Sequence, residues 1–323
     1  MAAPLLALDG LTVHYETRRG ALPAVAGVSL ELEPGAALGL VGESGSGKTS
    51  LAMAILKLLP DNARIVRGEI RFQGRDLVPL PEEQMRGVRW RGISMIFQAA
   101  MNAWNPVYTV GQQIVEAIQT HEPRVSDAEA RARVAELFEM VGLDRSRMDQ
   151  YPHQYSGGMK QRAVIAMALA SRPQLVLADE PTTALDVIVQ DRILKELDAI
   201  RRKLGMAMIY ISHDIAVIAE VSERVGVMYA GRLVELGPGE KVFHRPIHPY
   251  TDGLMKAFPS IRGPRRALQA IPGDPPNLLN LPPGCPFHPR CPLAVDRCRV
   301  EAPALVAYEP DHRAACWRPL GYS

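Results

Sequence analysis

The feature that most restricts how this chain can fold is a glycine-rich segment, GESGSGKT, at residues 42–49. It fits the pattern G-x-x-x-x-G-K-[ST], in which glycines let backbone N–H groups turn towards phosphate oxygens. The apolar run Ala36–Val41 precedes it and predicts a short buried strand, and Thr49–Leu59 has the composition of a helix. This order also places the positive N-terminus of a helix at the loop. The sequence therefore predicts a phosphate-binding loop within an α/β fold.

The polar side chains of this loop have separate expected roles. We expect Lys48 to reach the terminal phosphates of a nucleotide with its ammonium group, and Thr49 to offer its hydroxyl to Mg²⁺. The residues expected to bind the nucleotide in and beside the loop are Gly42, Ser44, Gly45, Ser46, Gly47, Lys48, Thr49 and Ser50.

A pair of carboxylates follows a second apolar run. Leu175–Ala178 predicts a buried strand, and Asp179 and Glu180 come at its end, where open α/β sheets bind ligands. In phosphoryl transfer the protein mainly positions groups and stabilises charge. We therefore expect Asp179 to hold Mg²⁺, and Glu180 to orient and deprotonate the attacking water.

A third motif, Ser156-Gly157-Gly158, opens a helix-like run upstream of the carboxylates. The ordered set of phosphate loop, serine–glycine–glycine and Asp-Glu closely resembles the ATPase subunits of ABC transporters, over about residues 5–258. The resemblance implies that the serine and glycines contact ATP bound to an opposite subunit, so that a second copy of the fold completes each site. It also implies that Asp186 lies in a loop that crosses the dimer interface. Tyr155 stands where the family more often has leucine.

The same resemblance implies roles for three isolated residues. Tyr15 matches the aromatic residue that stacks on adenine, and Gln98, after the predicted strand Ile93–Phe97, matches a glutamine that contacts Mg²⁺ and water. His213, in a Ser-His-Asp sequence after a β-like run, matches a histidine that contacts the γ-phosphate. The expected catalytic residues are Glu180, His213, Lys48 and Gln98. The expected magnesium contacts are Thr49, Gln98 and Asp179.

Alternating strand and helix patterns predict an α/β core with a largely parallel sheet. Residues 5–15 and 24–33 are expected to form strands, with Gly27 in a turn. We expect Ser126 to start a helix, and Gly205 to end one at Val187–Leu204. The expected fold class is therefore a P-loop NTPase, an ABC-type nucleotide-binding domain at 1–258 with an inserted helical subdomain at about 99–172. A small, irregular, cysteine-containing extension is expected at 259–323.

The composition indicates which partners and which cellular compartment suit the chain. Its 323 residues are 47% hydrophobic and 22% charged, as in soluble globular proteins, and the net charge of +2 offers no general attraction for nucleic acid. No apolar run approaches the roughly 18 residues that a membrane-spanning helix needs. The N-terminus lacks the basic and apolar regions of a signal peptide. We therefore expect a cytosolic protein that reaches the cytoplasmic face of the membrane only through partner subunits.

Four cysteines and about half of the 27 prolines lie in the extension, and this shift in composition predicts a boundary near 258–263. The cysteine spacing is C-x5-C-x6-C-x17-C. The cytosol keeps thiols reduced, which disfavours disulfides, and four clustered thiolates suit Zn²⁺ or an iron–sulfur cluster. The close Cys pairs of zinc knuckles are absent, and four free structural cysteines are a further alternative.

This tail resembles the C-terminal extension of oligopeptide and dipeptide importer ATPases. In some members, four cysteines are thought to hold a [4Fe–4S] cluster. By resemblance we expect such a cluster here, structural rather than redox-active, with zinc as the alternative. A tail that senses redox state and gates hydrolysis is a further hypothesis. The expected cluster ligands are Cys285, Cys291, Cys298 and Cys316.

The expected function is the ATPase subunit of an ABC importer of the peptide/nickel type, with ATP and Mg²⁺ as cofactors. The resemblance implies a paralogous ATPase or a second copy as partner, two permeases, an extracellular solute-binding protein and no nucleic acid. The segment AAMNAWNPVYTV at 99–110 is expected to press on the permeases. Di- or oligopeptides are the expected solutes, with oligosaccharides or nickel as alternatives. A soluble ABC ATPase in DNA repair or translation is disfavoured, because the chain has no long heptad run and no basic tract.

Overall fold

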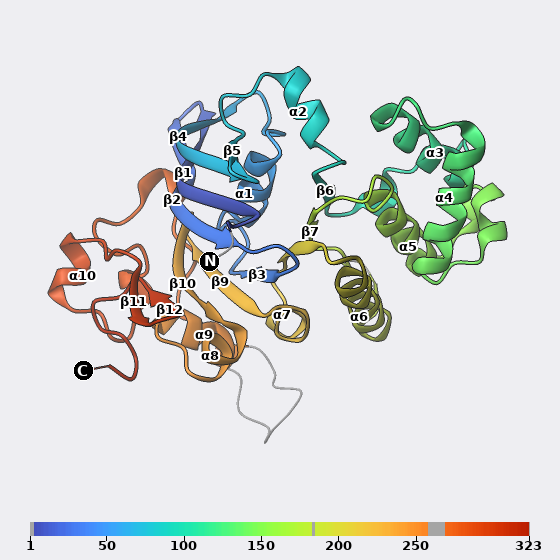
Figure 1. Ribbon diagram of the computed structural model, residues 1–323. Coiled ribbons are helices and arrows are strands. Elements are labelled where there is room, and N and C mark those ends of the chain that lie inside the picture. Colours follow the sequence, from blue (N-terminus) through green and yellow to red (C-terminus); the bar gives the residue numbers. More distant parts are fainter. Residues whose placement is uncertain (1–2, 183–184, 258–268, 323) are drawn as a thin grey trace. The chain divides into compact units, whose positions relative to one another are not determined.

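The computed structural model describes residues 3–182, 185–257 and 269–322 (Figure 1). Contacts divide the chain into two compact units. The first unit consists of residues 1–33, 37–79 and 210–323, and the second of residues 34–36 and 80–209. Among the described residues, no helix combines the length and the apolar composition needed to cross a lipid bilayer.

The first unit contains a four-stranded antiparallel sheet in the order β2-β1-β4-β5 (Figure 1). Its strands are β1 (Leu6–Thr17), β2 (Gly20–Leu32), β4 (Ala63–Phe72) and β5 (Arg75–Asp76). The prediction of a turn at Gly27 is wrong, because β2 runs through this residue. Gly27 has φ +69°, and the β1–β2 register shifts around it, so the glycine supplies an irregularity inside the strand rather than its end.

The second sheet of this unit carries the phosphate loop. Strands β3 (Ala37–Val41) and β9 (Arg224–Tyr229) are parallel, and every residue of β3 is buried, as in a central strand covered on both faces. Antiparallel strands continue the sheet through β10 (Arg232–Pro238), β12 (His312–Ala314) and β11 (Val306–Glu309). The helices of this unit are α1 (Lys48–Ile55), α7 (Ile215–Val221), α8 (Gly239–His244), α9 (Pro249–Ala257) and α10 (Asp296–Val300).

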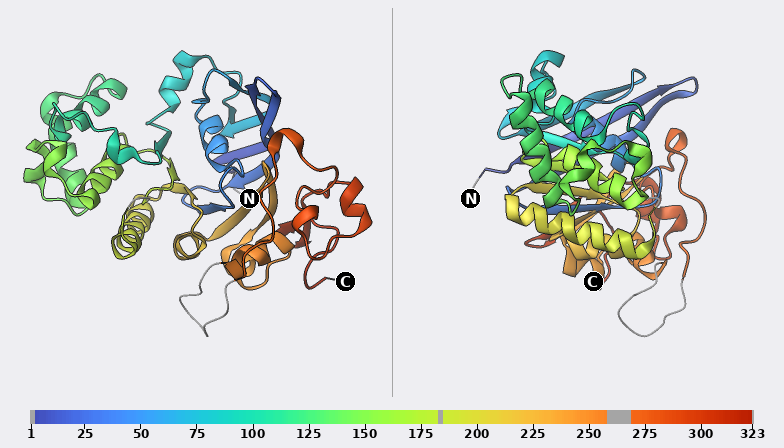
Figure 2. Two further views of the ribbon diagram at one scale, coloured as in Figure 1. Left: turned by 180° about the vertical axis from the view of Figure 1, so that it is seen from behind. Right: turned by 90° about the vertical axis from the view of Figure 1, so that its right-hand side faces the viewer.

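The second unit combines a parallel strand pair with helices. Strands β6 (Ile93–Ile96) and β7 (Leu175–Asp179) pair in register from Ile93 with Leu175 to Ile96 with Ala178. The helices are α2 (Glu82–Val88), α3 (Val110–His121), α4 (Asp127–Met140), α5 (Gly157–Ala168) and α6 (Val187–Leu204). In both views of Figure 2 the green helices of residues 110–168 gather in one group.

Local signals account for several helix ends. Ser126 caps α4 in a reciprocal capping box with Glu129, as expected. Helix α6 spans the predicted residues and ends at Gly205, whose φ of +64° closes the last turn. Helix α4 buries Ala130, Val134 and Phe138 along one face.

Strand β8 (Ala207–Ile211) belongs to both units, since the boundary falls after Ile209. In the second unit, Ala207 N donates a hydrogen bond to Gln174 O. In the first unit, Ser212 N, just beyond the strand, donates to Leu40 O in β3. The predicted domain boundary near 258–263 lies outside the described residues, so the division at residue 258 and the extent of the helical subdomain stay predictions.

Candidate nucleotide-binding site

The glycine-rich loop joins β3 to α1, and two of its glycines are required by sterics. Gly42 has φ +150°, and a Cβ there would lie 2.2 Å from Met228 O. Gly47 has φ +103°, and a Cβ there would lie 2.2 Å from Ala24 O. Any other residue would place its Cβ against backbone atoms, which could move away only at a high cost in free energy. The first and sixth positions of the sequence pattern thus correspond to close backbone approaches in the fold.

Lys48 lies inside the loop and is only 7% exposed. Its Nζ donates hydrogen bonds to Gly42 O at 2.7 Å, Glu43 O at 2.9 Å and Ser46 Oγ at 3.1 Å. The ammonium group is thereby held where the backbone curves around it. All of α1 is described, and its first turn has neither an acidic residue nor a side-chain cap, so the positive helix end is not neutralised from within the helix.

The first unit brings two more predicted residues to this region. Tyr15 is half-buried in β1, and its hydroxyl lies 3.2 Å from Ser50 Oγ in the first turn of α1. His213 is exposed and follows Ser212, whose N–H bonds to Leu40 O near the end of β3. Because the phosphate loop begins directly after β3, His213 and the loop emerge at the same edge of the sheet. Thr49 and Ser44 are exposed at the loop surface.

The second unit brings Gln98 and Glu180 together. Strands β6 and β7 are parallel and in register, so the residues that follow them lie side by side. Gln98 Nε2 donates a 2.8 Å hydrogen bond to Glu180 Oε2. Asp179, the last residue of β7, is 1% exposed. Glu180 has φ +47°, an uncommon conformation for a side-chain-bearing residue and one that tends to occur at functional sites.

The serine–glycine–glycine motif forms the start of α5. Ser156 Oγ accepts a hydrogen bond from Met159 N, which makes Ser156 the helix N-cap. Further along α5, Gln161 Nε2 donates to Pro181 O, which links this helix to the segment after Glu180. Asp186 is the N-cap of α6 and accepts from Val189 N at 2.9 Å.

Tyr155 stands at the position where the family more often has leucine, and the fold accommodates the larger side chain by burying it. It is 6% exposed, and its hydroxyl donates a 2.7 Å hydrogen bond to Arg147 O. Burial raises the pKa of this phenol, so it stays neutral. Tyrosine therefore fills the apolar position and satisfies its polar end.

The predicted residues form two groups, each within its own unit. The first unit holds the phosphate loop, Tyr15 and His213, and the second holds Gln98, the two carboxylates, the serine–glycine–glycine motif and Asp186. Sequence reasoning missed two residues that contact the loop, Tyr250 and Arg290. The loop pattern itself provides no signal for either, since both lie more than 200 positions further along the chain.

The predicted [4Fe–4S] cluster is wrong, and so is the alternative of zinc. The described residues include all four cysteines, and in them no group of three or more His, Cys, Asp or Glu side chains is arranged to hold a metal ion. The thiols of Cys285, Cys291, Cys298 and Cys316 line one cavity, but its volume is only about 10 Å³. That volume has room for about one water molecule.

Burial also affects the thiols themselves. It raises the pKa of Cys285 and of Cys291, and it raises the pKa of Cys316 to about 12. These three groups are therefore protonated at neutral pH. The spacing correctly predicted that the four cysteines lie together, but their side chains pack as small apolar groups. The redox-sensor hypothesis depended on the cluster and is dropped with it.

Strand pairing and buried contacts hold the extension instead. Strand β12 pairs with β10, with Ala314 opposite Glu235. His312 Nε2 lies 2.7 Å from Glu235 Oε1, and both side chains are at most 1% exposed. Outside this core, the Arg297 guanidinium lies 3.4 Å from the centre of the Trp317 ring.

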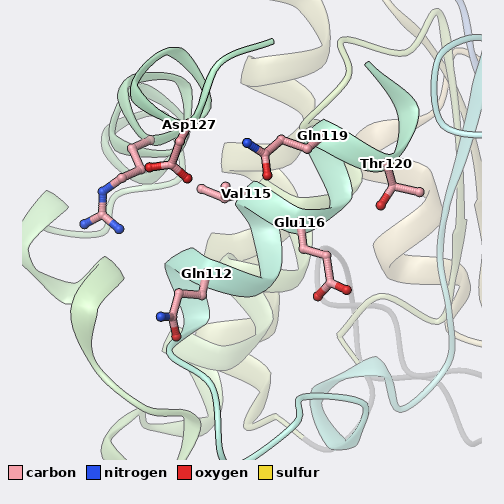
Figure 3. A pocket seen from close by; sticks show the side chains of 7 residues that line it. Gln112, Val115, Glu116, Gln119, Thr120 and Asp127 are labelled. Atoms are coloured by element: carbon pink, nitrogen blue, oxygen red, sulfur yellow. The ribbon is translucent and has the colours of Figure 1, made fainter. Parts of the chain in front are cut away.

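A further hollow of about 470 Å³ lies between α3 and α4. Figure 3 shows Gln112, Glu116 and Gln119 along α3, with Asp127 beside them on α4. It is lined mostly by polar side chains and contains none of the predicted site residues, so it is separate from the second unit's group.

Comparison with known proteins places these observations in a family. Residues 25–183 match the family model described as "ABC transporter", and residues 234–298 match "Oligopeptide/dipeptide transporter, C-terminal region". The chain is 47% identical over 318 residues to the probable peptide ABC transporter ATP-binding protein y4tR of Sinorhizobium fredii, covering 97% of this chain and 95% of that protein.

Two further proteins are similar to this chain over different shares of their length. The oligopeptide transport ATP-binding protein OppD of Mycobacterium tuberculosis is 46% identical over 98% of this chain, which spans 52% of that relative, about half its length. A dimeric structure of the ATP-binding cassette MJ0796, in a post-hydrolysis state with ADP and Pi, matches with a TM-score of 0.64 and 27% identity. That match covers 72% of this chain and 98% of the cassette. The chain therefore belongs to the ABC ATPase family, in the branch of oligopeptide and dipeptide transport ATP-binding proteins.

Proposed function

We propose that this chain binds and hydrolyses ATP to drive the import of di- and oligopeptides through partner membrane subunits. The observation that carries the proposal is the loop of residues 42–49, whose backbone curves around the Lys48 ammonium and excludes any side chain at Gly42 and Gly47. Such a loop, opening a helix whose positive end is not neutralised from within, suits a polyphosphate.

Binding would use residues of both groups. Lys48 would exchange its bonds to loop carbonyls for bonds to phosphate oxygens, and Tyr15, held beside α1, would stack on the adenine. Thr49, Gln98 and Asp179 carry the oxygen ligands that Mg²⁺ prefers. When bound, Mg²⁺ supplies positive charge that neutralises the phosphates during transfer. The other proposed nucleotide contacts are Ser44, Gly45, Ser46 and Ser50.

Hydrolysis would depend on Glu180 as the general base. Its carboxylate accepts a hydrogen bond from Gln98 Nε2, so the base and the amide lie side by side, and both would contact the attacking water. His213, exposed at the edge where the phosphate loop begins, would donate a hydrogen bond to the terminal phosphate. Positioned acid–base groups of this kind typically contribute about 100-fold to 10,000-fold in rate.

A second subunit would complete each site. Ser156 and Gly157 are exposed at the start of α5, and a Cβ at Gly157 or at Gly158 would make only ordinary contacts, at 3.5 and 3.4 Å. Packing inside the described chain therefore does not require glycine at either position. Close approach of another molecule to this helix end is a physical reason for both. The partner is a second copy or a paralogous ATPase, and Asp186 would lie at the same interface.

Contact with permeases would place the subunit at the cytoplasmic face of the membrane. Val107 and Tyr108, in the segment before α3, are 69% and 52% exposed, which suits a surface that docks against partner subunits. Two permeases and an extracellular binding protein would handle the solute, which this subunit does not touch. The match to the oligopeptide/dipeptide C-terminal region favours peptides over oligosaccharides or nickel.

The test uses proteoliposomes that contain the complete transporter, with wild-type chain or the Glu180→Gln variant. The proposal predicts that a radiolabelled tripeptide is taken up and stimulates phosphate release, while a trisaccharide and Ni²⁺ are not taken up. Glu180→Gln should lower phosphate release at least about 100-fold. Phosphate release that drives trisaccharide or Ni²⁺ uptake would refute the peptide assignment, and full activity of the variant would refute the role of Glu180.

A further inference from the structure

A partly buried ion pair connects the C-terminal extension to the phosphate loop within the first unit. Arg290 lies at the end of the short helix His288–Arg290, next to Cys291. Its Nη1 is 2.7 Å from Glu43 Oε2 and its Nη2 is 2.9 Å from Glu43 Oε1. Two parallel bonds between a guanidinium and a carboxylate give both strength and a defined geometry.

The guanidinium is fixed on its other sides as well. Arg290 Nε donates to Pro272 O at 2.8 Å, and Nη1 lies 3.4 Å from Tyr229 Oη. The Arg290 side chain is only 6% exposed, whereas that of Glu43 is 24% exposed. The pair with Glu43 raises the pKa of Arg290, which stays charged. The arginine is therefore a rigid group, and the loop residue is the more accessible partner.

The same loop residue is held by its backbone. Glu43 N donates a 2.9 Å hydrogen bond to Tyr250 Oη, and Tyr250 is fully buried. The Tyr250 ring packs with Tyr229 and Phe287, at centroid distances of 4.5 and 5.3 Å. Glu43 O in turn accepts from Lys48 Nζ and from Ser46 N. A continuous set of contacts thus runs from Arg290 through Glu43 to the lysine of the loop.

We propose that Arg290 is a positioning residue through which the C-terminal extension sets the affinity of the phosphate loop for ATP. This inference rests on the proposed function, in which the loop binds the phosphates. Arg290 holds the loop in shape and neutralises a carboxylate that is part of it. Without the guanidinium, the Glu43 carboxylate would be left close to the negative charges of the nucleotide, and like charges oppose one another most where water is partly excluded.

The charge of Glu43 distinguishes this role of Arg290 from a purely structural one. Arg290→Met should weaken ATP binding by about 10-fold, within the usual range for coupling between sites. Adding Glu43→Gln to Arg290→Met should recover most of the lost affinity, because it removes the uncompensated carboxylate. Arg290→Lys keeps the charge but loses the paired geometry, so it should fall between wild type and Arg290→Met.

The experiment measures equilibrium binding of MgATP to the full chain by calorimetry, with circular dichroism to check folding. Lys241→Met is the matched control, since Lys241 pairs with Glu309 of the extension and, among the described residues, has no hydrogen bond or ion pair to the loop. Lys48→Ala tests the proposed function separately. Loss of binding in Lys48→Ala with unchanged binding in Arg290→Met and Arg290→Lys would overturn the inference alone. Unchanged binding in Lys48→Ala would overturn the proposed function.

Two outcomes decide the remaining cases. If the double variant binds as weakly as Arg290→Met, the carboxylate is not the cause and the inference is refuted. If Arg290→Met does not fold, Glu43→Gln and Arg290→Lys still test the pair. Wild-type ATP affinity in Arg290→Lys, equal to that of the control Lys241→Met, would contradict the need for paired geometry.

Discussion

The buried His248 makes folding of the first unit sensitive to mild acid. This residue lies directly before α9 and is 2% exposed. Its Nδ1 accepts a hydrogen bond from Tyr250 N at 3.0 Å, and its own backbone N–H donates to Glu235 Oε2. Burial lowers the pKa of His248 from 6.5 to about 4, although the Glu235 carboxylate acts in the opposite direction.

The direction of the effect follows from proton uptake. Between about pH 6.5 and pH 4 the unfolded chain binds a proton at this histidine and the folded chain does not. The stabilisation is therefore complete above the unfolded pKa and is lost as pH falls towards the folded pKa. At ~1.36 kcal/mol per pKa unit, the free energy of unfolding falls by ~2 kcal/mol from pH 6.5 to pH 5, and by ~3 kcal/mol in full.

The matched variant is His248→Asn, which does not titrate. Asparagine is favoured at the residue before a helix, and its side-chain oxygen can accept from the backbone N–H two residues on, as His248 does. Urea unfolding of both proteins at pH 7, 6 and 5 isolates the histidine, because all other titrating groups are shared. Wild type should lose ~2 kcal/mol more than the variant between pH 7 and pH 5. Parallel pH profiles would show that His248 does not cause the acid sensitivity.

Two further predictions concern single residues. Gly47→Ala should greatly weaken ATP binding, because the new Cβ would meet Ala24 O. Gly45 has φ +77° but nothing within 4 Å of a Cβ, so Gly45→Ala should cost only the ~1–2 kcal/mol of conformational energy of a left-handed residue. Equal ATP affinities of the two variants in a nucleotide-binding assay would contradict this contrast. Tyr155→Phe should lower the free energy of unfolding by ~1 kcal/mol, because it removes the hydrogen bond from the Tyr155 hydroxyl to Arg147 O, and should leave ATP turnover unchanged. Chemical denaturation checks the first effect, and a variant as stable as wild type would show that the hydroxyl contributes nothing.

Local sequence patterns predicted much of the fold. The span of α6, its stop at Gly205 and the capping box at Ser126 follow from side-chain spacing and backbone conformation within a few residues. The phosphate loop was equally predictable, because a glycine pattern records close backbone approaches. Gly27 was misplaced because a positive φ serves a strand irregularity as well as a turn.

Contacts between distant residues were not predictable in the same way. Nothing near residue 43 indicates that Arg290 will meet it, since the pair forms only when β10, β12 and the extension are in place. The cysteine spacing indicated that the thiols share one place but not what fills it. Metal binding and apolar packing both bring cysteines together, and the side-chain arrangement and the cavity volume distinguish them.

We propose that Lys48 is needed to bind ATP and Glu180 to hydrolyse it. The most direct measurement compares MgATP binding and phosphate release for wild type, Lys48→Ala and Glu180→Gln in the assembled transporter. We expect Lys48→Ala to lose binding, and Glu180→Gln to keep wild-type affinity and lose at least about 100-fold in turnover. Weakened binding in Glu180→Gln, or binding retained in Lys48→Ala, would contradict it.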